Sequence, residues 1–136
     1  MSEHRKKAWA ITLDIGDDER LESRVLAITE HVTAPLEQTS WSVEDIDASG
    51  PLGNKLTQLL NETRPVRITT RALSEVLNED GQIIEMDATL EKDGDRVLRI
   101  VVRDGISVDV LGTGQPPDPN VLGKHRAIAP ELFFWE

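Results

Sequence analysis

Two of the three histidines in this chain lie where they could do acid–base chemistry or bind a ligand. His31 lies next to Val32 in a segment with helical periodicity, where a histidine near the end of a helix also simply suits the helix dipole. His125 lies between Lys124 and Arg126 in a segment without periodicity, and such loops carry functional residues more often than cores do. Together with Arg67, the two histidines are the candidate lining of a pocket between helices and sheet.

Motifs of known catalytic or cofactor sites are absent from the sequence. It has no phosphate-binding loop, no HExxH, no GxSxG and no pair of histidines at metal-ligand spacing. The chain has no cysteine, which excludes disulfides, thiolate metal ligands and cysteine nucleophiles. We therefore predict no catalytic residue, no metal site and no cofactor.

The balance of charge favours a basic partner. The chain has 25 acidic and 15 basic residues, for a net charge of −10 at pH 7. Such a surface repels nucleic acid phosphates and anionic membranes. Acidic residues gather within 14–22 and again within 79–95, and the second group falls on a predicted sheet face. The candidate partner-binding residues are Glu85, Asp87 and Glu91, with Phe134 and Trp135 of the C-terminal tail.

The first half of the chain predicts one strand and two helices. Residues 8–15 alternate bulky and small side chains, as a strand with one buried face does. Leucine, valine and isoleucine then recur at helical spacing, which predicts a helix over 18–33. A second helix is expected from Ser49-Gly50-Pro51 to near Arg64. Between the two helices we expect a short strand at 39–43 and a loop at 44–47.

The next part of the chain predicts an antiparallel meander. Glu79-Asp80-Gly81, Lys92-Asp93-Gly94 and Arg103-Asp104-Gly105 each suit a three-residue hairpin loop closed by a glycine with positive φ. With loops at 92–94 and 103–105, apolar residues pair throughout one face, as a specified register requires. The buried face then has a row of Met86, Ile100 and Val108, and Val102 opposite both Ile84 and Ile106; the exposed face has a row of Asp87, Arg99 and Asp109.

The segment 65–78 is harder to assign. Residues 65–70 predict a strand. Residues 71–78 alternate as a fourth meander strand would, although their helix propensity is good; we favour the strand. Residues 112–136 are rich in glycine and proline at first and predict an irregular tail with an aromatic end.

These elements predict one α+β domain over residues 1–136, with a flexible N-terminus at 1–6. An N-terminal strand and two helices precede a meander of three or four antiparallel strands, and the helices cover one face of the sheet. An exposed edge of the meander would let two copies pair as a homodimer. The chain has no signal peptide and no membrane-spanning run, so we expect a complete cytoplasmic protein.

Two functions fit this sequence. The first is a non-enzymatic acidic interaction protein, such as an inhibitor, an immunity- or antitoxin-like partner, or a subunit of a complex, that binds a basic protein surface. The second is a small-molecule-binding domain or small enzyme with its pocket between helices and sheet. A pocket of about 300 Å³ or more with convergent polar groups would favour the second. We favour the first.

The aromatic end of the chain gives a testable prediction. Leu132, Phe133, Phe134 and Trp135 would expose an apolar patch if they were free in solution. We expect at least two of the three aromatic side chains to be buried, against the domain or in a homodimer contact. Deleting residues 132–136 should therefore lower the melting temperature or change the oligomer mass. An unchanged melting temperature, mass and set of partners would contradict this prediction.

Overall fold

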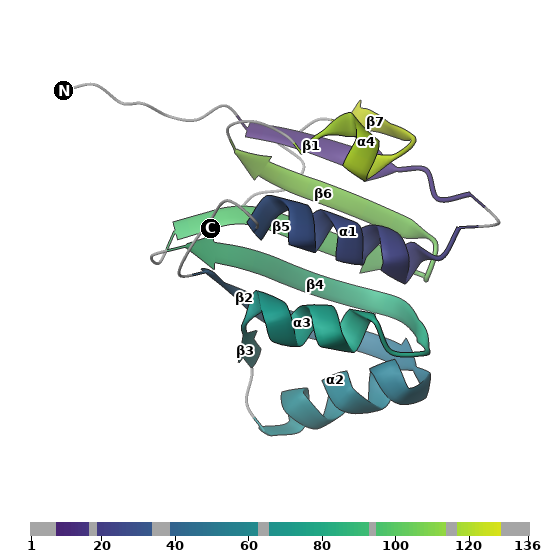
Figure 1. Cartoon of the computed structure of the whole chain (residues 1–136), viewed down its shortest axis with the longest axis vertical. Helices are drawn as coiled ribbons and strands as arrows, with labels where there is room; N and C mark the ends of the chain where they lie inside the picture. Colours follow the sequence, from purple (N-terminus) through teal and green to yellow (C-terminus); the bar gives the residue numbers. More distant parts are fainter. Residues whose placement is uncertain are drawn as a thin grey trace.

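A seven-stranded antiparallel sheet organises the chain, with the strands in the order β3-β2-β4-β5-β6-β1-β7 (Figure 1). The computed structural model describes residues 8–16, 19–33, 39–62, 66–92, 95–113 and 117–128. The strands are β1 (Ala8–Leu13), β2 (Thr39–Ser49), β3 (Val66–Ile68), β4 (Gln82–Lys92), β5 (Asp95–Arg103), β6 (Ser107–Thr113) and β7 (His125–Ile128); the helices are α1 (Leu21–Thr33), α2 (Gly50–Glu62), α3 (Thr70–Leu77) and α4 (Pro119–Leu122). The predicted α+β class is confirmed, while the arrangement has more strands and helices than expected.

The first strand joins the two ends of the chain. β1 pairs along its length with β6, from Ala8 opposite Thr113 to Leu13 opposite Val108, and its other side pairs with β7. Its alternation works as predicted: Ile11 and Leu13 are buried in the main core. The N-terminal strand therefore lies inside the sheet, next to strands that are distant in sequence.

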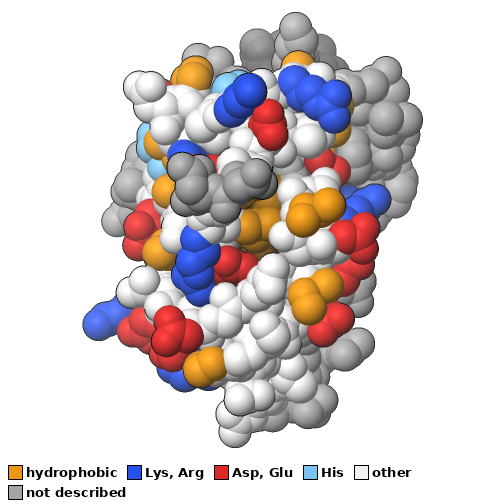
Figure 2. Space-filling view, turned by 90° about the vertical axis from the view of Figure 1, so that its right-hand side faces the viewer, with side chains coloured by type: hydrophobic (Ala, Val, Ile, Leu, Met, Phe, Trp, Pro, Cys, Tyr) orange, Lys and Arg blue, Asp and Glu red, His pale blue; other side chains and the backbone are white. Residues whose placement is uncertain are grey.

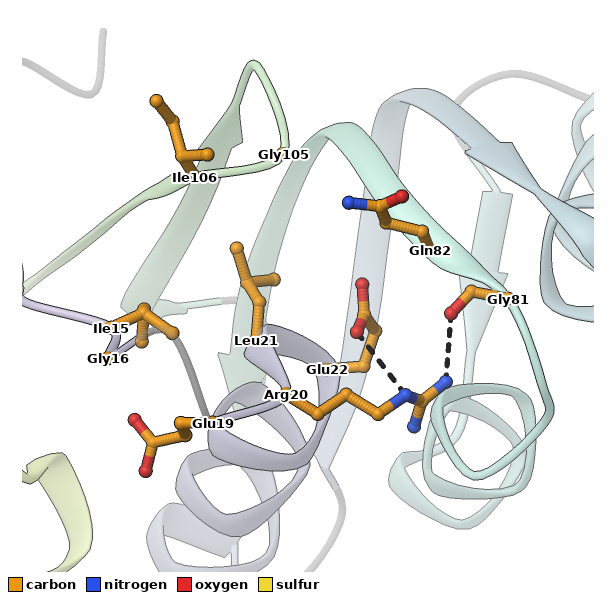
Figure 3. Close-up of a pocket in the computed structure, with 10 residues that line it drawn as sticks. All are labelled: Ile15, Gly16, Glu19, Arg20, Leu21, Glu22, Gly81, Gln82, Gly105 and Ile106. Carbon is orange, nitrogen blue, oxygen red and sulfur yellow. Dashed lines mark hydrogen bonds and ion pairs between the residues drawn. The ribbon is translucent and has the colours of Figure 1, made fainter.

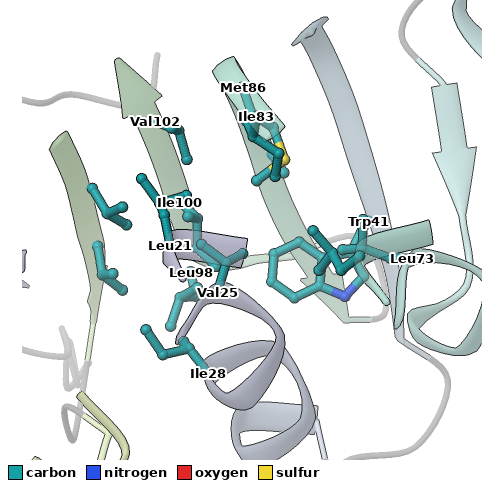
Figure 4. Close-up of a cluster of buried hydrophobic side chains, with 14 of the residues drawn as sticks. Leu21, Val25, Ile28, Trp41, Leu73, Ile83, Met86, Leu98, Ile100 and Val102 are labelled. Carbon is teal, nitrogen blue, oxygen red and sulfur yellow. The ribbon is translucent and has the colours of Figure 1, made fainter. Parts of the chain in front are cut away.

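The main core lies between the sheet and the helices α1 and α3 (Figures 1 and 4). Leu21, Val25 and Ile28 follow one another on one face of α1, and all three are buried, because helical spacing brings them to the same side. Trp41 of β2 is completely buried, and its indole N–H donates to the Thr70 hydroxyl at 3.0 Å. That hydrogen bond satisfies the polar atom of the largest side chain in the core.

The meander β4-β5-β6 is present, but both hairpins pair two residues away from the predicted register. Met86 lies opposite Val102, and Ile100 lies opposite Ala88 and Val110. Lys92 pairs with Asp95, one residue away from the predicted register, and a bulge at Val97 shifts the pairing by one residue more. Because side chains alternate with a period of two, a shift of two residues leaves the paired residues of the three strands on their predicted faces. Met86, Ile100 and Val108 are accordingly all buried.

The turn between β5 and β6 explains the second shift. Asp104 and Gly105 both have positive φ, 56° and 68°, and the Ile106 N–H donates to the Arg103 carbonyl at 3.2 Å. Positive φ at both central residues is typical of a type I′ turn, which Asp-Gly favours. The loop therefore occupies 104–106, and Ile106 lies in the turn rather than opposite Val102 as predicted.

The other face of the sheet is less exposed than predicted. Asp109 is 8% exposed and accepts a hydrogen bond from the Thr12 hydroxyl at 2.8 Å. Ala10, Val101 and Leu111 form a second buried cluster, against which Ile128 packs. The predicted exposed row is therefore wrong for Asp109, because apolar neighbours on adjacent strands share its face.

Three local predictions are wrong. Residues 71–78 are not a strand: α3 begins after Thr69, whose side chain accepts from the Ala72 N–H at 3.1 Å, and buries Leu73, Val76 and Leu77 at helical spacing. Residues 44–47 are not a loop but part of β2, with irregular pairing to β4 on either side of 45–47. The predicted irregular tail contains the end of β6, α4 and β7.

The structure also bears on the predicted free edge of the meander and on the predicted positive φ of the turn glycines. Within the described residues both outer strands of the meander have a neighbour in the sheet, β2 beside β4 and β1 beside β6, so the sheet edges are β3 and β7 instead. Gly81 and Gly105 have positive φ as predicted, although Gly81 follows a helix rather than a strand. Gly94, the N-terminal residues 1–6 and the aromatic tail at 132–136 lie outside the described residues.

Shortening Ile100 tests the core. Ile100 is completely buried, so Ile100→Ala should lower the free energy of unfolding by about 2–5 kcal/mol. Ile106→Ala removes the same atoms from an exposed site and should change it by less than about 0.5 kcal/mol. Urea denaturation of both variants measures the difference, and equal losses would contradict the assignment of these two residues.

Candidate functional site

The three residues of the predicted pocket do not lie together. Arg67 is exposed on β3, at one edge of the sheet, and His125 is half-buried on β7, at the opposite edge. His31 is exposed in the last turn of α1. His125 Nδ1 is 2.7 Å from the Gly123 carbonyl, a local contact that fixes the ring. These residues have no shared cavity in which to act.

The predicted acidic docking residues lie on one face of β4, but two of them are ion-paired. Asp87 accepts from the Arg99 guanidinium at 2.9 and 2.5 Å, and Glu91 accepts from Arg67 at 2.5 Å. The hydrogen bond to Asp87 raises the pKa of Arg99, burial opposes that rise, and the charges of Asp87 and Glu44 support it. Arg99 thus stays charged and neutralises Asp87. Glu85 lies half-buried on the same strand.

Four segments converge instead at one end of the sheet, which we call the loop end: residues 13–22, 49–55, 75–82 and 103–107, as far as the structure describes them. The Gly105 N–H donates to the Ile84 carbonyl at 2.9 Å, which joins the β5–β6 turn to β4. The Leu52 N–H donates to the Asp80 carbonyl at 2.9 Å, which joins α2 to the turn before β4. Figure 2 shows this end face on, with hydrophobic, basic and acidic side chains next to one another.

A hollow of about 400 Å³ opens at the loop end (Figure 3). Its lining comes from the chain before α1, the first turn of α1, the start of β4 and the β5–β6 turn. Ile15, Leu21 and Ile106 supply apolar surface, whereas Glu19, Arg20, Glu22 and Gln82 supply polar groups; Gly16, Gly81 and Gly105 complete the lining. Because apolar and polar groups line the same hollow, one ligand could contact both kinds.

Glu22 is the buried charged group of this hollow. It is only 3% exposed, and its Oε2 accepts from the Ile83 N–H at 2.7 Å. It belongs to the first turn of α1, where the helix dipole favours a negative charge. The carboxylate thus joins the start of α1 to the start of β4. Its other oxygen lies 3.5 Å from Nε of Arg20, which is long for a strong ion pair.

Arg20 is held mainly by backbone carbonyls. Its guanidinium donates to the Glu79 and Gly81 carbonyls at 2.8 and 2.9 Å, and Figure 3 shows it reaching past Glu22 to Gly81. These contacts fix the turn before β4 against the start of α1. They also keep the guanidinium at one side of the hollow.

Ile106 lies across the hollow from Arg20, and its side chain is 75% exposed. Among the described residues it is the exposed large hydrophobic side chain, and a tight turn with two positive φ angles holds it there. Single exposed hydrophobic residues are common. The position of this one beside a hollow is what distinguishes it. The sequence pattern missed it because it assigned Ile106 to a buried strand face. The Asp104-Gly105 pair before it was the signal in the sequence that could have placed Ile106 in a turn.

Acidic residues outnumber basic ones in the described parts of the loop end. The acids are Asp14, Glu19, Glu22, Glu75, Glu79, Asp80 and Asp104; the bases are Arg20, Lys55 and Arg103. In the part of the chain that the structure describes, no three of the acids and histidines are grouped as metal ligands. No helix in that part is long and apolar enough to cross a bilayer.

Comparison with models of known protein families, with curated proteins and with solved structures finds no match for this chain.

Replacing Glu22 tests its structural contact. Glu22→Ala leaves the buried Ile83 N–H without an acceptor and should lower the free energy of unfolding by about 1–3 kcal/mol. Glu22→Gln keeps a carbonyl oxygen at that position and should cost clearly less. Chemical denaturation compares the two, with Glu75→Ala, an exposed acid, as the control. A loss for Glu22→Ala no larger than that of the control would show that the hydrogen bond contributes nothing.

Proposed function

We propose that this chain is a non-enzymatic interaction protein that binds a basic protein surface through its loop end. The observation that carries the proposal is Ile106, which is exposed beside a hollow whose lining includes Glu19 and Glu22. Interfaces typically combine an apolar anchor with a charged rim, and the rim sets partner choice and the rate of association. Net charge of −10 gives the whole molecule the sign that attracts a basic partner.

The position of the proposed surface differs from the sequence-based one. Asp87 and Glu91 on β4 are already paired with arginines, so a partner would have to displace Arg99 or Arg67 to reach them. At the loop end, Asp80 and Asp104 are exposed, and Asp80 lies next to the turn that borders the hollow. Exposed acids beside an apolar anchor favour this end of the molecule over the sheet face.

Photo-crosslinking at position 106 tests the proposal. A photoreactive amino acid in place of Ile106 should crosslink the partner in an extract of the natural host. The same residue in place of Ala127, which is exposed on the edge strand β7, should not. In a second experiment the photoreactive amino acid replaces Gln82, an exposed neighbour of Ile106. There, Ile106→Asp should abolish the crosslinked complex, whereas Ala127→Asp should leave it intact. Equal crosslinking from positions 106 and 127 would contradict a docking surface at the loop end.

Salt dependence tests the electrostatic part. Association of the captured partner should slow as salt rises, since rim charges act mainly on the association rate. Asp80→Lys should slow association more than Glu30→Lys, which makes the same charge change at an exposed position on α1. An association rate that stays constant between low and high ionic strength would remove charge attraction from the proposal.

The hollow itself favours a second candidate function, small-molecule binding. Its volume exceeds the roughly 300 Å³ at which ligand pockets begin, and polar groups line it. Against this, the charged groups around it are already engaged within the protein: Glu19 with Arg24, and Arg20 with two carbonyls. A thermal-shift screen with small metabolites separates the two, since a small-molecule site predicts stabilisation by a free compound without any protein partner.

A further inference from the structure

The last strand, β7, forms one edge of the sheet (Figure 1). β1 pairs with one side of it, and within the described residues no other strand pairs with its second side. Edge strands present unpaired backbone groups, to which an extended segment of another chain can add as a further strand. The opposite edge strand, β3, is three residues long, whereas β7 has four. β7 is therefore the longer of the two edges.

One backbone hydrogen bond determines which groups of β7 face its open side. The Asp14 N–H donates to the Lys124 carbonyl at 2.8 Å, so these two residues form a hydrogen-bonded pair where β1 ends and β7 begins. In an antiparallel ladder such pairs alternate with pairs that are not hydrogen-bonded. His125 and Ala127 therefore hold the second kind of position, and their N–H and C=O groups point away from β1. β7 thus offers backbone donors and acceptors to a new strand.

The side chains of β7 give this edge a chemical preference. Arg126 and Ile128 lie on the sheet face opposite the main core, where Ile128 packs against the second buried cluster. Arg126 is exposed and forms no ion pair with another described residue. The acid of its row on this face is Asp109 of β6, which accepts from the Thr12 hydroxyl. Arg126 is therefore available to an acidic group of a partner.

A basic neighbour strengthens the preference for an acid. Lys124, directly before β7, is exposed, and its Nζ lies 3.5 Å from a carboxylate oxygen of the exposed Asp14. Ion pairs between exposed side chains contribute little, so this contact leaves most of the lysine's charge effective. The start of β7 is thus basic although the whole chain has a net charge of −10.

A second copy of the chain is a poor occupant of this edge. Two β7 strands paired antiparallel about their centres would place the two Arg126 side chains opposite each other, and like charges in that position are destabilising. The net charge of −10 also makes two copies repel each other. An acidic segment of a different protein has neither disadvantage.

We propose that β7 binds an extended acidic segment of another protein, which adds to the sheet as an antiparallel strand. His125 and Ala127 hydrogen-bond its backbone, Arg126 pairs with an acidic side chain, and Ile128 contacts an apolar side chain two positions away. This inference goes beyond the proposed function, because its ligand is opposite in charge to the partner of the loop end. Position 127 remains the control for that basic partner.

Nuclear magnetic resonance titration of the intact chain tests the proposal. The probe is the capped heptapeptide Thr-Val-Thr-Glu-Thr-Val-Thr, in which the glutamate and both valines share one face of an extended strand. It should shift the backbone amide signals of His125 and Ala127. The same peptide with glutamine in place of glutamate should bind about two- to fivefold more weakly, since an exposed ion pair contributes modestly.

Backbone methylation separates strand addition from simple charge attraction. An N-methyl group on the threonine that follows the glutamate removes a donor facing β7 and places the methyl group against the strand, so binding should fall at least about tenfold. An N-methyl group on the glutamate itself points away from β7 and should leave most of the binding. Both peptides keep their charge, and the comparison needs no variant of the protein.

Protein variants identify the groups responsible. Arg126→Gln should abolish the preference for the glutamate peptide over the glutamine peptide. Arg67→Gln, the same change at an exposed position on the other edge strand, should leave that preference intact. Ala127→Pro removes an N–H that faces the open side without removing a bond to β1, so it should weaken binding of both peptides.

Any of the following outcomes would overturn the proposal: no shift at His125 and Ala127, equal binding of the glutamate and glutamine peptides, equal losses from the two methylated peptides, or an unchanged preference in Arg126→Gln. A dimer of the free chain that Ala127→Pro dissociates would assign the edge to a second copy instead. The proposed function is judged separately, by crosslinking from position 106, which does not depend on these peptides.

Discussion

The hydrogen bond between the Glu22 carboxylate and the Ile83 N–H is the contact on which the loop end depends. It connects the first turn of α1 with the first part of β4, elements 61 residues apart in sequence. Arg20, two positions earlier, fixes the adjoining turn through the Glu79 and Gly81 carbonyls. These contacts hold the start of α1 against the start of β4, and the Gly105–Ile84 hydrogen bond holds the β5–β6 turn, so the three stretches of chain that line the hollow are fixed to one another. A buried charge is costly unless it is paired, and here its pairing is also what places the candidate site.

Charge has two different uses on this molecule. On the sheet face, Asp87 and Glu91 form ion pairs with Arg99 and Arg67. These charges stabilise the packing of neighbouring strands, so few unpaired charges are left there to attract a partner. At the loop end, the acids exceed the bases within the described residues. Asp14 and Glu75 pair with Lys124 and Arg71, whereas Asp80 and Asp104 make no ion pair with another described residue. The net charge of a chain thus says little about where a partner binds; the pairing of individual side chains decides that.

Much of the fold could be predicted from local patterns, and the exceptions have physical causes. The helix ending at Thr33 and the helix beginning at Gly50 follow from apolar periodicity and capping. The faces of β4, β5 and β6 were correct although their register was not, because a shift of two residues preserves alternation. The alternation of apolar and polar side chains does not predict the bulge at Val97 or the positive φ of Asp104, because both are features of the backbone conformation. Residues 71–78 alternate as well as any strand, but the Thr69 cap and the burial of one helical face favour a helix.

The candidate site could not be predicted in the same way. Its acidic members within 14–22 were visible as a cluster, but Ile106 was assigned to the core, and nothing local links Glu22 to Ile83 or Arg20 to Gly81. Those links depend on where β4 begins relative to α1, which is a consequence of the whole sheet. The predicted grouping of Arg67 and His125 failed for the same reason, since strand order places them at opposite edges.

The position of β1 between β6 and β7 has a consequence for how the chain folds. Residues 8–13 have both of their sheet neighbours within 108–128, so this strand has nothing to pair with in the sheet until segments far along the chain have folded. Contacts of such sequence separation slow folding, because a long loop must close before they form. β1 would therefore remain unpaired while the meander forms, and this side of the sheet would close late, with β6 on one side of β1 and β7 on the other.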